Sequence, residues 1–104
     1  MIVSTMNDLP GYRIDEVIGE ITGLTVRSRN VGTQIGAGFK SLVGGELKGY
    51  TELLQEARQE AIDRMIQQAQ SVGANAIVNV RFSTSNITQG AAELFAYGTA
   101  VKVD

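Results

Sequence analysis

One stretch of the chain, from Tyr50 to Phe82, constrains the fold more than any other. Between Thr51 and Val72 apolar residues recur every three or four positions, which is the spacing of one helical face. The residues on this face are Leu54, Ala57, Ala61, Met65, Ala69 and Val72. Gly73 follows, and glycine readily takes the left-handed conformation that commonly ends a helix. We therefore predict one long amphipathic helix that ends at this glycine.

After Ala74 and Asn75 the period of the sequence changes from 3.6 to 2, which is typical of a strand. Alternation then predicts two opposite sets of side chains: Ala76, Val78, Val80 and Phe82 on one face, and Ile77, Asn79, Arg81 and Ser83 on the other. We expect this strand to cover Ala76 to Ser85. The polar residues from Ser83 to Gly90 predict a turn, and Ala91 to Val103 predict the last strand of an antiparallel sheet.

Both faces of the last strand are largely apolar. One face is expected to carry Glu93, Phe95, Tyr97, Val101 and Val103, and the other Ala92, Leu94, Ala96, Gly98, Ala100 and Lys102. A single helix covers only one face of a sheet, so the second face needs another cover. A second copy of the chain is the simplest candidate, which predicts a homo-oligomer.

The N-terminal half adds further elements. Ile2 to Thr5 is a short β-prone segment, and Leu9 to Tyr12 has the Pro-Gly pattern of a type II turn. Ile14 to Arg27 is rich in β-branched residues, and we expect a bend or bulge near Gly19 or Gly23. Ser28 to Gly49 predicts a short, glycine-rich helix. Residues 1–104 thus predict a single α+β domain, with an antiparallel sheet packed on one long helix.

Composition excludes several classes of function. The chain of 104 residues has no cysteine and no histidine, so it lacks a thiolate nucleophile, the commonest general base and the commonest transition-metal ligands. Its net charge of −2 argues against a nucleic-acid partner. No secretory signal and no apolar run of about 20 residues is present, so we expect no membrane partner and a cytoplasmic location. No cofactor is indicated.

The best candidate ligand site is a basic segment at the end of the long strand. Arg27 and Arg29 precede the predicted short helix, and Asn30 could cap its first turn. Two guanidinium groups beside unsatisfied helix N–H groups could bind a phosphate or a carboxylate. We therefore predict a small anionic ligand at Arg27, Arg29 and Asn30. The alternative is that both arginines form ordinary ion pairs.

Carboxylates are grouped at two other places. Glu52, Glu56 and Glu60 are spaced four apart on the long helix, in a row that ends at Arg64. This row predicts a solvated face with a Glu60–Arg64 pair, although ion pairs between subunits and a site for a hard cation are alternatives. In the long strand, alternation places Glu16 and Glu20 on the same side, with Asp15 opposite, and all three are expected to face solvent.

These elements together resemble the YbjQ family of small bacterial proteins. The matching segments are Pro10-Gly11-Tyr12, Arg29-Asn30, Val43-Gly44-Gly45, Gly49-Tyr50, Glu56-Ala57-Arg58, Ala61, Met65, Gly73 to Val78 and Gly98 to Val101. The resemblance implies a dodecin-like or YbjQ-like subunit that assembles as a homo-oligomer, a pentameric ring. Proteins of this family are commonly labelled "putative heavy-metal-binding", and they have no settled activity. A chain without cysteine or histidine departs from what that label requires.

The function expected from all of this is binding without catalysis, of a small ligand or a partner protein. The alternatives are an enzyme with a carboxylate and arginine site between subunits, a metal-binding protein, and a purely structural ring. A pocket between subunits that contains perturbed carboxylates would favour the enzyme. An interface without a pocket would favour the structural ring.

Overall fold

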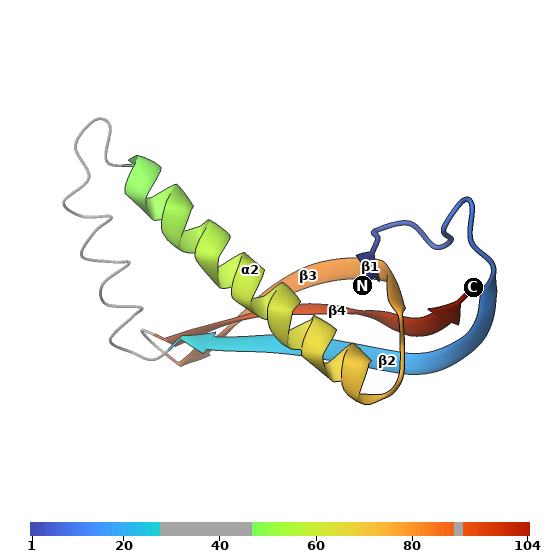
Figure 1. Cartoon of the computed structure of the whole chain (residues 1–104). Helices are drawn as coiled ribbons and strands as arrows, with labels where there is room; N and C mark the ends of the chain where they lie inside the picture. The colour runs from blue at the N-terminus through green and yellow to red at the C-terminus, as the bar shows by residue number, and fades with distance from the viewer. Residues whose placement is uncertain (28–46, 89–90) are drawn as a thin grey trace.

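The computed structural model describes residues 1–27, 47–88 and 91–104, which form one helix packed on one sheet (Figure 1). The sheet has four strands in the order β1-β3-β4-β2. The elements are β1 (Ile2–Val3), β2 (Ile14–Arg27), α2 (Leu47–Ser71), β3 (Ala76–Thr88) and β4 (Ala91–Val103). The pairs β3–β4 and β4–β2 are antiparallel, as expected, but β1 runs parallel to β3, so the sheet is mixed.

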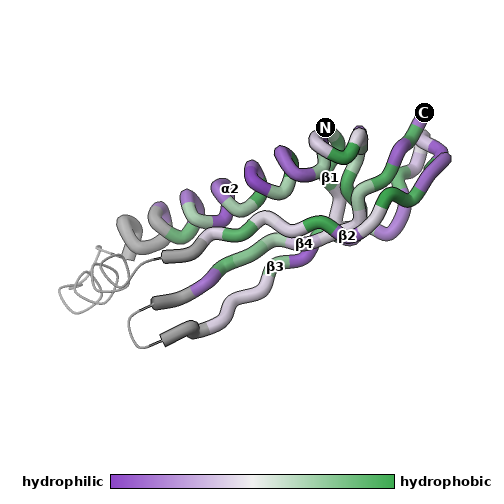
Figure 2. Tube along the Cα trace, turned by 90° about the horizontal axis from the view of Figure 1, so that it is seen from below, coloured by the Kyte–Doolittle hydropathy of each residue, from purple (hydrophilic) through white to green (hydrophobic). Residues whose placement is uncertain are grey.

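The predicted long helix is confirmed as α2, which begins at Leu47 and ends at Ser71. It lies along one side of the sheet (Figure 2). The helix buries the row Ala57, Ala61, Met65 and Ala69, all four of which belong to the predicted apolar face. Leu54 and Val72 also belong to that prediction, but they are 47% and 46% exposed. In Figure 1 the N-terminal turns of α2 extend away from the sheet, and Val72 follows the last helical residue.

The sequence Gly-Ala-Asn-Ala that follows α2 ends the helix and connects it to the sheet. Gly73 has φ 83°, and its N–H donates to the carbonyl of Gln70, while the N–H of Ala74 donates to the carbonyl of Ala69. These two bonds form a Schellman motif. The side chain of Asn75 then bonds both backbone groups of Val103, with its Nδ2 2.7 Å from the carbonyl and its Oδ1 2.8 Å from the amide nitrogen. The helix end is thereby tied to β4.

The helix approaches β2 most closely at Gly23. A Cβ atom at this position would lie 1.9 Å from the Ala61 carbonyl oxygen and 2.5 Å from the Met65 backbone nitrogen. Glycine at this point of β2 and alanine at position 61 of α2 therefore let the two backbones come together. The predicted bulge lies at the other candidate glycine, because the register of β2 shifts between Val17 and Gly19, where Gly19 has φ 149°.

In β3 the predicted alternation is wrong beyond Val78. Ile77 and Val80 pack with the helix, whereas Ala76 and Val78 pack on the other side of the sheet. The cause is a β-bulge: the register shifts between Val78 and Arg81, and Asn79 has φ 56°. The expected turn from Ser83 to Gly90 is also too long, because β3 continues to Thr88 and pairs with β4 throughout.

We call the side of the sheet that faces away from α2 the free face. The faces predicted for β4 are confirmed, since Ala96 and Ala100 pack with the helix while Val101 and Val103 do not. The N-terminal segment covers part of the free face, where Leu9 is buried in one cluster with Val101 and Val103, and Ile2 and Ile14 pack against this cluster. The expected turn at its centre is confirmed by the Tyr12 N–H, which donates to the Leu9 carbonyl at 2.9 Å. The chain itself therefore covers part of the surface for which we expected a partner.

The predicted short helix within Ser28–Gly49 falls mostly outside the described residues, and Leu47 to Gly49 belong to α2.

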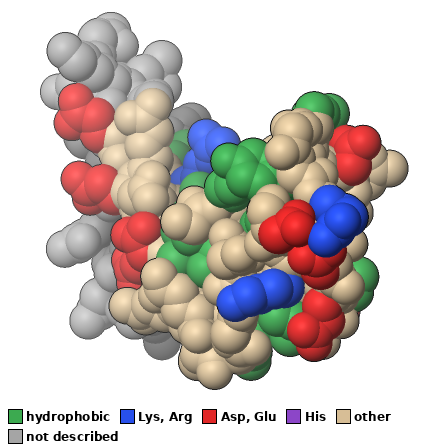
Figure 3. Space-filling model, turned by 45° about the vertical axis from the view of Figure 1, so that its right-hand side comes forward, with side chains coloured by type: hydrophobic (Ala, Val, Ile, Leu, Met, Phe, Trp, Pro, Cys, Tyr) green, Lys and Arg blue, Asp and Glu red, His purple; other side chains and the backbone are tan. Residues whose placement is uncertain are grey.

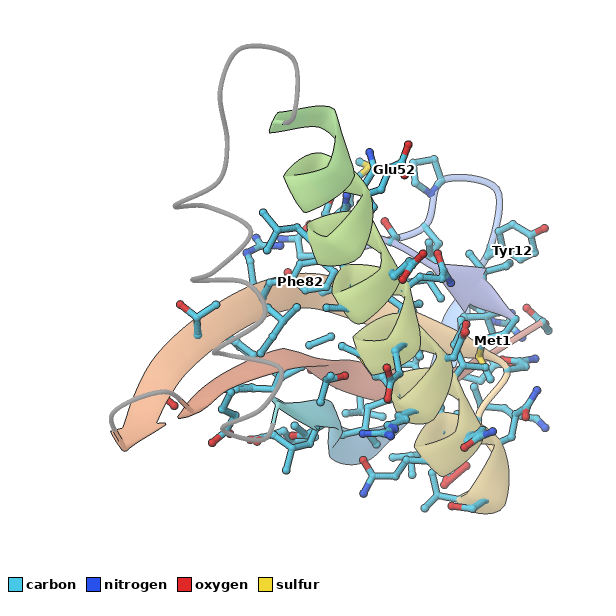
Figure 4. The ribbon with its side chains drawn as sticks, turned by 90° about the vertical axis from the view of Figure 1, so that its left-hand side faces the viewer. Met1, Tyr12, Glu52 and Phe82 are labelled. Carbon is cyan, nitrogen blue, oxygen red and sulfur yellow. The ribbon has the colours of Figure 1, made fainter. Side chains whose placement is uncertain are left out.

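Phe82 of β3 lies next to α2 (Figure 4). The Arg58 guanidinium of the helix lies over its ring, 5.0 Å from the ring centroid. In the part of the chain that the structure describes, no helix has the length and apolar character needed to cross a membrane.

Candidate functional site

Beside the part that the N-terminal segment covers, the free face holds a shallow hollow of about 460 Å³. It lies over the middle of the three long strands, where β2, β4 and β3 run side by side. Its lining residues are Glu20, Thr22, Asn79, Ser83, Phe95, Tyr97, Gly98 and Thr99. All but Gly98 carry a polar group or an aromatic ring. The hollow is therefore suited to contact with a partner surface or a small molecule.

Phe95 and Tyr97 line the hollow, and with the neighbouring Leu24 they make a strip of apolar side chains, which we call the aromatic strip. Phe95 and Tyr97 follow each other on the same face of β4, and their rings pack with centroids 5.8 Å apart and planes tilted by 39°. Leu24 of β2 is the register partner of Phe95. Leu24 is 40% exposed and Tyr97 37% exposed. Large apolar groups that stay half in water side by side are typical of an interaction surface.

The opposite side of the hollow is shaped by the bulge in β3. Asn79 takes a left-handed conformation, which asparagine tolerates better than most residues. Its N–H donates to the Met6 carbonyl at 2.9 Å, and the N–H of Val80 donates to the Ser4 carbonyl at 3.0 Å. These bonds to the N-terminal segment hold the bulge in place. An asparagine between two valines in a strand was the sequence signal for this feature, because asparagine is depleted in regular strands.

Glu20 is the one charged residue among those that line the hollow. Its register partner is Thr99, on the free face, whereas Glu16 pairs with Lys102, which lies on the helix side and donates to the Gly73 carbonyl. The prediction that Glu16 and Glu20 share a side is therefore wrong. The bulge between Val17 and Gly19 adds one residue to β2 and moves the later residues to the opposite face.

The hollow offers hydroxyl groups and aromatic surface. Thr22, Ser83, Thr99 and Tyr97 supply hydroxyl groups, and the rings supply apolar surface. A hydroxyl nucleophile needs an adjacent base, and among the lining residues the only candidate is the exposed carboxylate of Glu20. No hydrogen bond between that carboxylate and a lining hydroxyl occurs in the described part of the chain.

The predicted anion site is not tested by the structure. Arg27 is the last residue of β2, where its backbone pairs with Ala92, but its side chain is outside the described part of the chain. Arg29 and Asn30 lie outside the described residues altogether. The site at Arg27, Arg29 and Asn30 stays a prediction.

The carboxylate row on α2 is partly as predicted. Glu60 and Arg64 form the expected ion pair at 2.6 Å, and Glu52 and Glu56 are exposed. Among the residues that the structure describes, no group of three or more Asp, Glu, His or Cys side chains is close enough to hold a metal ion. On the face that Figure 3 shows, Lys and Arg side chains lie scattered among acidic ones rather than in one basic patch.

Comparison with known proteins places the chain in a family. The family model YbjQ_1, described as "Putative heavy-metal-binding", matches residues 1–104. A UPF0145 protein of Hahella chejuensis is 54% identical over 104 residues, which cover 100% of both chains. A UPF0145 protein of Streptomyces coelicolor is 55% identical over 103 residues, covering 99% of this chain and 97% of the relative.

A solved structure shares the fold. It is a crystal structure of a protein of unknown function from the DUF74 family of Pediococcus pentosaceus, which matches with a TM-score of 0.51 and 19% sequence identity. The match covers 100% of this chain and 98% of that protein. With a family model that matches its whole length, the chain belongs to the YbjQ family, and it is similar to UPF0145 proteins at more than 50% identity.

Proposed function

We propose that this chain is a cytoplasmic, non-catalytic binding protein that works as a homo-oligomer, with a second copy docked on the uncovered part of the free face. A ring of five copies is the assembly that the family resemblance implies. The observation that carries the proposal is the aromatic strip, in which Leu24 and Tyr97 are 40% and 37% exposed beside Phe95. Neither α2 nor the N-terminal segment covers this strip in the described part of the chain.

We infer a second copy of the chain as the occupant of this surface, because α2 covers only one face of the sheet and a further cover is needed on the other. The N-terminal segment packs with Val101 and Val103, and the aromatic strip is not part of that cluster. Leu24, Phe95 and Tyr97 therefore offer a second copy a continuous apolar contact surface.

The proposed binding role follows from the hollow beside the strip. Its volume of about 460 Å³ falls within the range of roughly 300–1,000 Å³ of small-molecule sites. A second copy over the free face would enclose this space between subunits. Because the one charged lining residue is the acidic Glu20, a small anionic ligand is expected at Arg27, Arg29 and Asn30 instead.

Replacing Leu24 with aspartate tests the docking surface. The change Leu24→Asp removes apolar area from the strip and places a charge without a partner in the proposed interface. We expect the affinity between subunits to fall by about a hundredfold, or roughly 3 kcal/mol. Sedimentation velocity over a wide dilution series, with far-UV circular dichroism on the same samples, measures the subunit affinity and the folded state together.

Leu54→Asp is the matched control, because Leu54 is 47% exposed on α2 and is not part of the free face. This variant should sediment like the unmodified protein. A folded monomer at every concentration of the unmodified chain would refute the homo-oligomer. Equal effects of the two substitutions would refute the free face as its interface.

The metal-binding part of the family description does not fit the residues of this chain. A soft metal ion needs thiolate or imidazole ligands, and the sequence has no cysteine and no histidine. Of its three methionines, Met65 is fully buried on the side of α2 that faces the sheet. The carboxylates of the described residues do not gather into a group of three.

We therefore expect no stoichiometric, sub-micromolar binding of zinc, copper or mercury ions in isothermal titration calorimetry. A positive control comes from Gln59 and Asp63, whose side chains already touch at 2.9 Å across one helical turn. The double variant Gln59→His and Asp63→His places two imidazoles at this spacing and should bind zinc measurably. Tight, stoichiometric binding by the unmodified chain would show that the prediction is wrong.

A further inference from the structure

The outer edge of β2 carries an arrangement that the proposed function does not use. Because β2 is the last strand of the sheet, every second residue points its N–H and C=O away from β4. Two side chains of α2 form hydrogen bonds with outward backbone groups of this edge. The Gln68 Oε1 accepts a hydrogen bond from the Thr22 N–H at 2.7 Å, and the Arg64 guanidinium donates to the Leu24 carbonyl at 2.5 Å.

These two hydrogen bonds occupy backbone N–H and C=O groups with which an added strand would pair. In antiparallel pairing, an incoming strand bonds the outward N–H and C=O groups of alternate residues, here Thr22 and Leu24. Arg64 and Gln68 are four residues apart on α2, so both point to the same side of the helix. The close approach of α2 to β2 at Gly23, the residue between Thr22 and Leu24, brings both side chains within reach.

The strand behind this edge is well suited to pairing. β2 spans 14 residues and is rich in β-branched residues, which favour strands. Long, exposed edges of this kind add strands from other chains unless they are protected. Glu60 pairs with Arg64 at 2.6 Å, and this contact holds the guanidinium near the edge.

We propose that Arg64 and Gln68 form an edge guard that keeps β2 from pairing with the β2 strand of a second copy. Without the guard, two copies would join antiparallel, edge to edge, through Thr22 and Leu24. This contact is separate from the free face, since it uses backbone groups at the side of the sheet. The inference therefore does not rest on the proposed function.

The test compares the double variant Arg64→Ala and Gln68→Ala with the unmodified chain in sedimentation velocity. We expect a new, larger species in the double variant. Its association constant for the edge contact should be about tenfold higher than that of the unmodified chain. The matched control is Gln67→Ala with Gln70→Ala, two exposed glutamines of the same helix. This control should leave the distribution unchanged. If circular dichroism shows that the double variant does not fold, Gln68→Ala alone carries the same test.

A third substitution separates edge pairing from a merely structural role of the two side chains. Proline at position 22 removes the outward N–H and is tolerated on an edge strand. Adding Thr22→Pro to the double variant should abolish the larger species while the protein stays folded. An unchanged distribution in the double variant, or a larger species that survives Thr22→Pro, would overturn the proposal. The Leu24→Asp test of the free face expects the opposite change, a loss of association, so the two proposals fail independently.

Discussion

Replacing Ala96 with glutamate should unfold the chain. Ala96 is fully buried in β4, within the cluster that joins the sheet to α2. Its register partners are Gly23 of β2 and Phe82 of β3. A glutamate side chain therefore has to displace the helix or place a carboxylate among apolar groups, away from water. Breaking a core in this way costs more than about 4 kcal/mol, which is close to the whole stability of a small domain.

Far-UV circular dichroism and urea unfolding measure this effect. We expect Ala96→Glu to lose its cooperative transition near room temperature. Thr84→Glu is the control, because Thr84 is an exposed residue of β3 and the added charge stays in water. A folded Ala96→Glu protein with an unchanged urea midpoint would contradict the packing of α2 against this face.

Adding one methyl group at Gly23 should also destabilise the protein strongly. The Cβ of an alanine would lie 1.9 Å from the Ala61 carbonyl oxygen, and both this oxygen and the Met65 nitrogen belong to the helix backbone. A backbone cannot turn aside as a flexible side chain can, so α2 as a whole has to move outward. Overpacking of this kind costs about 3 kcal/mol, which lowers the melting temperature by roughly 15 °C for a domain of this size.

Gly98→Ala provides a graded comparison for Gly23→Ala. At Gly98 the new Cβ would lie 2.9 Å from the Val78 carbonyl oxygen and 3.0 Å from the Ile77 side chain, part of which can move. Thermal melts followed by circular dichroism should therefore rank the proteins as unmodified, Gly98→Ala and Gly23→Ala, in order of falling stability. A Gly23→Ala protein as stable as the unmodified one would contradict the close contact of α2 with β2.

Where local chemistry decides the structure, the predictions from sequence are accurate. Ala57, Ala61, Met65 and Ala69, which α2 buries, recur at the helical period, Gly73 ends the helix, and the Pro10-Gly11 turn forms as expected. The last strand has the predicted bounds and the predicted two faces. The Glu60–Arg64 pair is also local, since its members are four residues apart on one helix. The family could be named from such short motifs, and the comparisons confirm it.

The candidate site depended on irregularities that alternation does not predict. One extra residue at Asn79 moves Val80 to the helix side, and one near Gly19 separates Glu16 from Glu20. Because side chains in a strand alternate with a period of two, each bulge inverts the face of every residue after it. The sequence offered hints at both positions, a glycine and an asparagine within strands, but it does not show which way the partner strand shifts.

By itself, the sequence determined the elements of this protein: one long helix, its stop, the strands and the absence of thiolate and imidazole ligands. These follow from periodicity, backbone preference and side-chain chemistry, which act within a few residues. Only the tertiary structure decided that the N-terminal segment covers part of the free face, that the backbone of α2 lies closest to β2 at Gly23, and that Arg64 and Gln68 reach the edge of β2. Those contacts join residues 38 or more positions apart, and they depend on register and on the distance between backbones, which no local pattern encodes.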